Sequence, residues 1–158
     1  MMDSILSGVF YRLDPVVPPV PVIYDVSRSG RMYPVDYRTP IPFTVAHDNV
    51  SAYLEEFYCA APEFGATMLY ALFPNTYIDS NRSELDIDPD LLDGEWPVPL
   101  EWTSKSGLGL LKSKSRYGEP FQEKKLTVSE VMARLEKYHR PYHAELKNNI
   151  ERMRKAWG

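Results

Sequence analysis

Cysteine is nearly absent from this 158-residue sequence, which contains only Cys59. A single thiol excludes an internal disulfide framework, and we therefore expect a cytoplasmic protein. Cys59 lies in a stretch with apolar residues at helical spacing, which predicts a buried, inert thiol in preference to a nucleophile.

Excess positive charge and long apolar runs are also missing. The chain has 18 Lys and Arg residues against 22 Asp and Glu residues, and its formal charge of −4 argues against a partner held through nucleic-acid phosphates. No run approaches the length of a transmembrane helix, and the apolar segment at 5–11 is too short and poorly flanked for a signal peptide. We expect no nucleic acid and no membrane as partner.

Two ligand-binding patterns are incomplete. The acidic residues between 84 and 95 lack the order of an EF-hand loop, so we expect a solvated surface segment there. The glycines of residues 106–111 suit a close backbone approach, but the third glycine of a dinucleotide site is missing.

Proline is abundant, with 14 residues that lie mostly in the first hundred positions and favour loop-rich connections. The chain length fits one domain with a sizeable core. Residues 1–19 end in D-P-V-V-P-P, which predicts an extended N-terminal arm. Residues 20–158 are expected to form the α/β domain.

The first half of that domain has a strand, helix, strand pattern. Val20–Val26 and Ala66–Leu72 are short apolar runs typical of buried strands. Apolar residues between 50 and 61 recur every three or four positions, which predicts a helix ended by Pro62. This order predicts a parallel strand pair with a right-handed crossover, in a mixed or mostly parallel sheet with flanking helices.

The C-terminal region predicts a long helix over residues 127–157. Thr127 and Glu130 have the spacing of a capping box, and apolar residues follow with a period of 3.6. Pro141 is expected to kink this helix or to divide it.

A polar turn, Asp79-Ser80-Asn81-Arg82, follows the second predicted strand. A guanidinium can grip a carboxylate with two parallel hydrogen bonds, so Arg82 is a candidate for binding a small anion. The alternative is a structural arginine paired with Asp79 or Glu84 across the turn.

A second polar turn, residues 27–34, follows the first predicted strand, where ligands often sit in open α/β sheets. Arg28 is its candidate anion-binding residue. The alternative is that Arg28 is solvated or locally paired, with Asp36 as the nearest acid.

Taken together, these segments resemble the N-formylglutamate amidohydrolase family, which is related in fold to the zinc carboxypeptidases. The most specific elements of the resemblance are D-x-N-R at 79–82 and P-Y-H at 141–143. The supporting segments are P-V-I-Y-D-V-S-R-S-G-R-M-Y-P at 21–34, the helix and C-A-A-P-E-F-G-A around 54–66, A-L-F-P-N-T-Y-I at 71–78, G-L-G at 107–109 and R-L-E-K-Y-H-R before 141.

The resemblance implies roles for five residues. Asn81 and Arg82 match the pair expected to hold the substrate carboxylate, and Asp79 is expected to orient their turn. Tyr142 and His143 match the segment expected to face the same pocket. In this family a Zn²⁺ ion is expected to polarise the formyl carbonyl and to activate water.

The chain departs from the family pattern at the metal. Arg28 stands where the family has a metal-binding His, and Ser51 corresponds to an acidic residue, unless Asp48 takes that place. A second family His belongs to a segment expected after Gly158, so the resemblance implies a truncated, incomplete domain. A unit charge repelled at about 4 Å costs roughly 4 kcal/mol at an effective dielectric of about 20, and zinc doubles the charge. We therefore expect no metal and no cofactor in this chain.

The family reaction is hydrolysis of N-formylglutamate to glutamate and formate. Since the zinc ligands are lacking, we expect an amidohydrolase-like protein with impaired catalysis that binds a small carboxylate such as N-formylglutamate. The alternative is an inactive relative that acts as an anion-binding or protein-interaction module. An uncovered sheet edge is expected to allow homo-oligomers.

Overall fold

The main sheet of the protein has four strands in the order β1-β2-β4-β3. This architecture comes from a computed structural model that describes residues 3–102 and 107–158. The strands are β1 (Ser4–Leu6), β2 (Phe10–Leu13), β3 (Ile23–Val26) and β4 (Thr67–Ala71). β2 runs antiparallel to β1 and β4, whereas β3 is parallel to β4. The predicted α/β fold with a mixed sheet is confirmed, although the pairing is mostly antiparallel.

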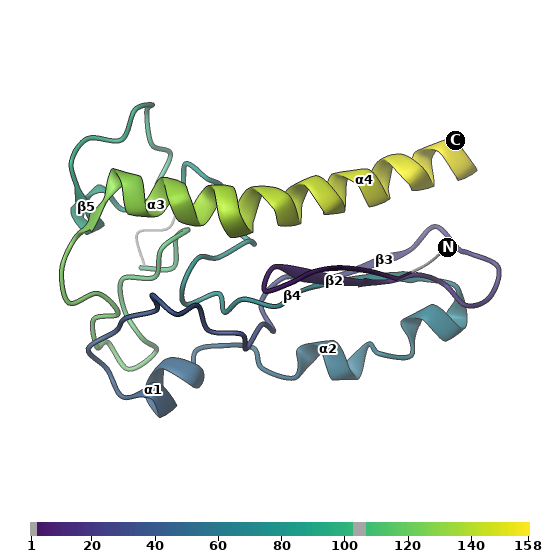
Figure 1. The fold of residues 1–158 in the computed structure, drawn as a ribbon, viewed down its shortest axis with the longest axis horizontal. Coiled ribbons are helices and arrows are strands. Elements are labelled where there is room, and N and C mark those ends of the chain that lie inside the picture. Colours follow the sequence, from purple (N-terminus) through teal and green to yellow (C-terminus); the bar gives the residue numbers. More distant parts are fainter. Residues whose placement is uncertain (1–2, 103–106) are drawn as a thin grey trace.

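Helices cover both faces of this sheet. Figure 1 shows α4 lying across one face and α2 on the opposite side. The helical elements are α1 (Phe43–His47), α2 (Leu54–Phe57), η1 (Ala61–Phe64), η2 (Pro89–Leu91), α3 (Val128–Arg134), η3 (Leu135–His139) and α4 (Arg140–Trp157). Two further short strands, β5 (Leu92–Asp93) and β6 (Leu126–Thr127), pair in parallel.

The N-terminal segment is a hairpin, not the extended arm predicted for residues 1–19. Gly8, at φ +74°, turns the chain between β1 and β2. β2 then pairs with β4 and buries Phe10 in the core. The prolines that suggested an arm all lie after β2, so they interrupt only the connection to β3.

The predicted helix over residues 50–61 is broken, although the predicted parallel strand pair is confirmed. Tyr53 has a left-handed backbone at φ 66°, and α2 then lasts only four residues. Phe57 is 82% exposed and Cys59 is also exposed, so the prediction of a buried thiol was wrong. The apolar stripe that suggested a core-facing helix points largely to solvent.

The C-terminal helical region begins at the predicted capping box, in which Thr127 and Glu130 exchange hydrogen bonds. The distortion expected at Pro141 is a π-helical turn, η3, which ends at His139. Proline has no N–H and cannot continue the ladder of helix hydrogen bonds, so the turn before it relaxes.

None of the described helices is long and apolar enough to span a membrane. The cytoplasmic location stays a prediction.

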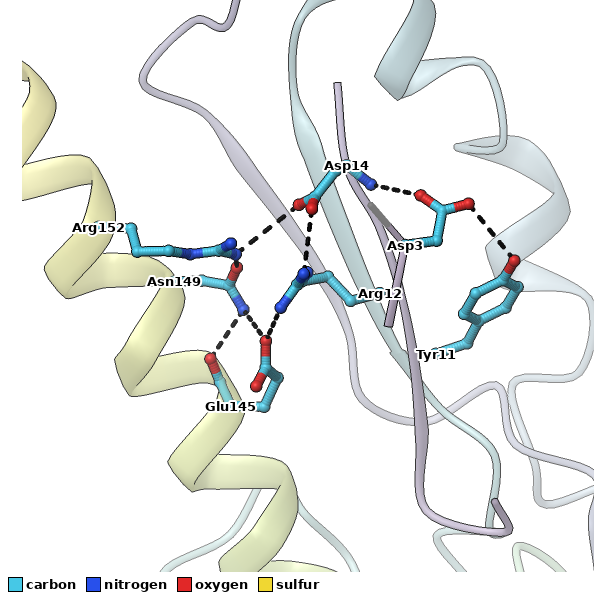
Figure 2. Close-up of polar contacts among 7 residues, drawn as sticks. All are labelled: Asp3, Tyr11, Arg12, Asp14, Glu145, Asn149 and Arg152. Carbon is cyan, nitrogen blue, oxygen red and sulfur yellow. Dashed lines mark hydrogen bonds and ion pairs between the residues drawn. The ribbon is translucent and has the colours of Figure 1, made fainter. Parts of the chain in front are cut away.

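A cluster of charged residues fastens α4 to the sheet (Figure 2). Arg12 of β2 bonds to Asp14 at 3.0 Å and also to Glu145 of α4. Arg152 lies 3.7 Å from Asp14 and bonds to Asn149, whose amide in turn reaches the Glu145 carboxylate at 3.2 Å. Because the Asp14 side chain is only 1% exposed, this contact is a buried ion network rather than a surface salt bridge.

Candidate functional site

The turn at residues 79–82 is tightly built. The backbone N–H of Asn81 donates to the Asp79 carboxylate at 3.0 Å, and the N–H of Arg82 donates to the Asp79 carbonyl at 3.1 Å. Asp79 is 1% exposed, so its carboxylate is held inside while Asn81 is exposed. Asp79 therefore orients this turn, in the position that the sequence predicted.

The turn after β3 lies directly beside it. A Cβ atom on Gly30 would stand 2.1 Å from the carbonyl oxygen of Phe73, so only glycine fits there. The Ser80 hydroxyl donates to the Ser27 carbonyl at 2.9 Å. These contacts bring together two polar turns that are about fifty residues apart in the sequence.

Arg28 and Asp79 join the two turns through an ion pair with two contacts. Nε of Arg28 lies 3.0 Å from one carboxylate oxygen, and a terminal nitrogen lies 2.8 Å from the other. Asp36, the acid predicted as the nearest partner, instead accepts a hydrogen bond from Tyr77 at 2.5 Å. Arg28 is thus paired, but with a carboxylate distant in sequence. Its anion-binding role stays a prediction, and an external anion there competes with Asp79.

Arg82 is paired far more loosely. Its nearest carboxylate is that of Asp86, at 4.0 Å, and its Nε is buried without a hydrogen-bond partner in the described residues. The two acids that the sequence suggested as partners of Arg82 are paired with other arginines, because Asp79 binds Arg28 and Glu84 binds Arg140, each at 2.8 Å. The hydrogen bond from Arg140 lowers the pKa of Glu84. Donors of the Arg82 guanidinium therefore remain available for a ligand.

Two histidines hold the turn from the helical side. Nε2 of His139 donates to the Arg82 carbonyl at 2.9 Å, and Nε2 of His143 donates to the Ser80 carbonyl at 2.8 Å. The ring centroids are 4.3 Å apart. Burial is the largest cause that lowers the pKa of His139, whose residue is only 4% exposed. His143 was predicted from the sequence as a site residue and His139 was not, although the two lie four residues apart in a segment predicted to be helical.

Tyr142 is placed differently from the other predicted residues. It is fully buried against Phe73, and its hydroxyl donates to the carboxylate of Asp25 on β3. Burial raises the pKa of both Tyr142 and Asp25. Tyr142 thus ties α4 to β3, and none of its described hydrogen bonds reaches the 79–82 turn.

Lys112 adds a cation that the sequence analysis missed. A Cβ on Gly109 would stand 2.5 Å from the Asp86 carbonyl, and the Asp79 N–H donates to the Leu110 carbonyl at 2.9 Å. The segment that carries Lys112 therefore packs against residues 79–86. Lys112 is 8% exposed, and its ammonium donates to the Asn49 carbonyl at 3.2 Å. No motif marked this lysine, because its position depends on contacts between distant segments.

The residues of this site do not fit a zinc ion. Among residues 3–102 and 107–158, no three His, Cys, Asp or Glu side chains group so as to hold a metal. The Asp79 carboxylate is bound by Arg28, and both histidines use Nε2 on backbone carbonyls. A cation such as Arg28 beside a metal would also be repelled strongly.

Comparison with known proteins places this geometry in a family. A family model described as N-formylglutamate amidohydrolase matches residues 20–158. The crystal structure of an N-formylglutamate amidohydrolase from Ralstonia eutropha JMP134 is similar at 34% sequence identity, with a TM-score of 0.90. The match covers 96% of this chain but only 55% of that one. No curated protein matches significantly.

Proposed function

Because the chain belongs to the N-formylglutamate amidohydrolase family, we propose that it binds N-formylglutamate or a closely related small carboxylate at the 79–82 turn. The observation that carries this proposal is the buried Nε of Arg82, which has no hydrogen-bond partner in the described residues. Buried polar groups are rarely left unpaired, so a bound anion is the natural acceptor for this guanidinium, whose side chain is 30% exposed.

Asn81 supplies the second contact in this proposal. Its backbone is fixed by Asp79, whereas the residue itself is exposed. A ligand carboxylate that Arg82 grips can therefore also accept from the Asn81 amide. The two histidines keep the turn rigid, which lowers the entropy lost when a ligand is bound.

We further propose that hydrolysis is impaired in this chain. The family reaction depends on zinc, and the described residues offer no zinc ligand set. Arg28, in the turn where the family places a ligand, is already paired with Asp79. Binding without turnover is the expected state of the chain alone.

Calorimetry with purified protein tests the binding. We expect N-formyl-L-glutamate to bind, and Arg82→Ala to weaken binding by roughly 10- to 100-fold, as for loss of a charged hydrogen bond. Arg38→Ala is the matched control, since Arg38 is exposed and donates only to the Val35 and Tyr37 carbonyls. Equal affinities of the wild-type protein and Arg82→Ala would remove the proposal.

Zinc content and formate release test the impairment. We expect no stoichiometric zinc after dialysis against zinc and no formate from N-formyl-L-glutamate. Bound zinc together with turnover that Arg82→Ala abolishes would show an active enzyme and contradict this part of the proposal.

A second candidate function, self-association, is favoured by an apolar groove beside β3. β3 is an edge strand, paired only with β4 among the described strands. The groove, of about 350 Å³, is lined by residues that include Val22, Phe57 and Phe64, and the two phenylalanines are 82% and 77% exposed. Edge strands with apolar side chains pair readily with another copy of the same chain.

Sedimentation at increasing concentration tests this candidate. We expect dimers that the Phe57→Ser, Phe64→Ser double variant dissociates, whereas Val35→Ser, at a 92% exposed site, leaves them intact. A monomer at all concentrations would exclude self-association.

A further inference from the structure

Lys112 is a buried cation without a counter-ion. The residue is 92% buried, and its ammonium has one described hydrogen-bond acceptor, the Asn49 carbonyl at 3.2 Å. No carboxylate of the described residues forms an ion pair with it. A buried ammonium is costly unless it is paired, so a lysine in this state calls for an explanation.

The surroundings of Lys112 make the imbalance larger. Three arginines of the same region each have a carboxylate within 4.0 Å: Arg28 has Asp79, Arg82 has Asp86 and Arg116 has Asp48. Four cations thus stand against three carboxylates, and Lys112 is the one left over. By this count the described residues of the region carry one excess positive charge.

The backbone places Lys112 between these partners. Asn49, whose carbonyl accepts from Lys112, also accepts the N–H of Arg116 on its side-chain oxygen at 2.8 Å. Two residues further on, the N–H of Ser51 donates to the Arg28 carbonyl at 3.2 Å. Residues 49–51 therefore connect Lys112 to Arg28, which forms the ion pair with Asp79 in the 79–82 turn.

We infer that Lys112 is the second anion-binding residue of this site, and that it engages the second carboxylate of an N-formylglutamate whose other carboxylate is held by Arg82. This inference rests on the proposed function, because it assigns the second charge of the same ligand. A ligand held only through a carboxylate on Arg82 leaves Lys112 without a counter-ion, whereas a second carboxylate beside the ammonium supplies one. Lys112 would then select dicarboxylates over monocarboxylates of the same shape.

The protonation of Lys112 provides a signature of this role. In the free protein its pKa is lowered, first by burial and then by the charges of Arg28, Arg116 and Arg82, while Asp79 acts in the opposite direction. A carboxylate bound beside the ammonium favours the charged form and raises the pKa again. Binding of the dianion should therefore be accompanied by proton uptake.

The experiment compares N-formyl-L-glutamate with N-formyl-L-glutamine, which has an amide in place of the second carboxylate. For the wild-type protein we expect roughly tenfold or greater preference for the glutamate derivative, as for gain of a charge-assisted hydrogen bond. In Lys112→Met this preference should fall to about one while binding of the glutamine derivative is kept. Circular dichroism of the variant checks that it is folded.

Proton uptake is measured in the wild-type protein, by calorimetry in two buffers of different ionisation enthalpy. We expect uptake with the dianion and none with the glutamine derivative, at pH values below the ordinary lysine pKa of about 10.4, because the pKa of Lys112 is lowered. This readout stands even if Lys112→Met does not fold.

The outcomes separate the two claims. If the wild-type protein binds both compounds equally, or binds the dianion without proton uptake, Lys112 has no such role although the carboxylate site remains. If the wild-type protein binds neither compound, the proposed function fails and this inference fails with it. A preference that survives in folded Lys112→Met also overturns the role of Lys112.

Discussion

The charged cluster between β2 and α4 and the cluster around the 79–82 turn differ in how completely their charges are matched. In the first, Arg12 and Arg152 meet Asp14 and Glu145, with Asn149 between them (Figure 2). In the second, no carboxylate among the described residues forms an ion pair with Lys112, and Arg82 is 4.0 Å from the carboxylate of Asp86.

This difference separates a structural role from a binding role. A matched, buried network satisfies its own charges and holds a helix in place, but it has little left with which to attract a ligand. A cluster with excess charge and an unpaired donor is less stable by itself and gains from an anion.

The largest effect is expected when the matched network is broken. Arg12→Met removes the partner of Asp14 and Glu145, whose side chains are 1% and 14% exposed. Loss of one partner from a buried ion pair destabilises proteins by about 3–5 kcal/mol, and we expect that loss in the free energy of unfolding measured with urea. Arg38→Met is the control and should change it by less than about 0.5 kcal/mol. A loss in Arg12→Met no larger than the control's would show that the network does not fasten α4.

A smaller loss is expected when the shortest of the described ion pairs in the second cluster, Arg28–Asp79, is broken. Arg28→Met leaves the Asp79 carboxylate buried without its cation, but Arg28 is 30% exposed, so water screens part of the effect. We expect about 2–3 kcal/mol of destabilisation in urea, below the buried-pair range. Adding Asp79→Asn should recover a large part of it, because no unpaired charge then remains. If the double variant loses as much free energy of unfolding as the two single variants together, the Arg28–Asp79 ion pair is not the cause of the destabilisation.

Ligand binding should stabilise the unmatched cluster only. With N-formyl-L-glutamate at ten times its Kd, we expect the free energy of unfolding to rise by about 1.4 kcal/mol. Thermal unfolding with and without ligand measures this rise, which Arg82→Ala should reduce to about 0.4 kcal/mol or less at the same ligand concentration. A folded variant of the matched network, such as Arg152→Met, should keep it. An equal rise in Arg82→Ala would mean that the ligand binds elsewhere.

The smallest effect concerns pH. The pKa of His139 is lowered in the folded protein, mainly by burial, so the unfolded chain binds more protons between the folded pKa and about 6.5. The contribution of His139 to the free energy of unfolding should therefore be complete above about pH 6.5 and should decrease as the pH falls towards the folded-state pKa. His139→Gln keeps a donor for the Arg82 carbonyl and should flatten this dependence. Urea unfolding from pH 5 to 8 compares the two proteins, and identical slopes would contradict the assignment to His139.

The sequence predicted the parts of the fold that depend on local patterns. The capping box at Thr127, the parallel strand pair and the distortion near Pro141 are all visible in short stretches, and the structure has each of them. The hairpin at residues 4–13 was missed because its partner, β4, lies more than fifty residues away. The broken helix was missed because the left-handed backbone of Tyr53 leaves no trace in an apolar pattern.

The site was predictable in the same uneven way. The D-x-N-R turn could be found from its residue types, and the Asp79 carboxylate accepts a hydrogen bond from the Asn81 N–H within it, while its part in substrate binding stays a prediction. The pairing of Arg28 with Asp79 and the burial of Lys112 depend on tertiary contacts across 51 residues and more. Family resemblance identified the turn, whereas its charge balance required the coordinates.

The most direct test of the carboxylate site observes Arg82 itself, through the ¹H–¹⁵N signal of its Nε–H group. This group has no acceptor in the described residues, whereas Nε of Arg140 already donates to Glu84 at 3.0 Å. On titration with N-formyl-L-glutamate we predict that the Arg82 Nε–H signal, assigned by its loss in Arg82→Lys, shifts and saturates, while the Arg140 signal stays in place. An Arg82 signal that does not move at saturating ligand would contradict the proposal that this guanidinium holds the substrate carboxylate.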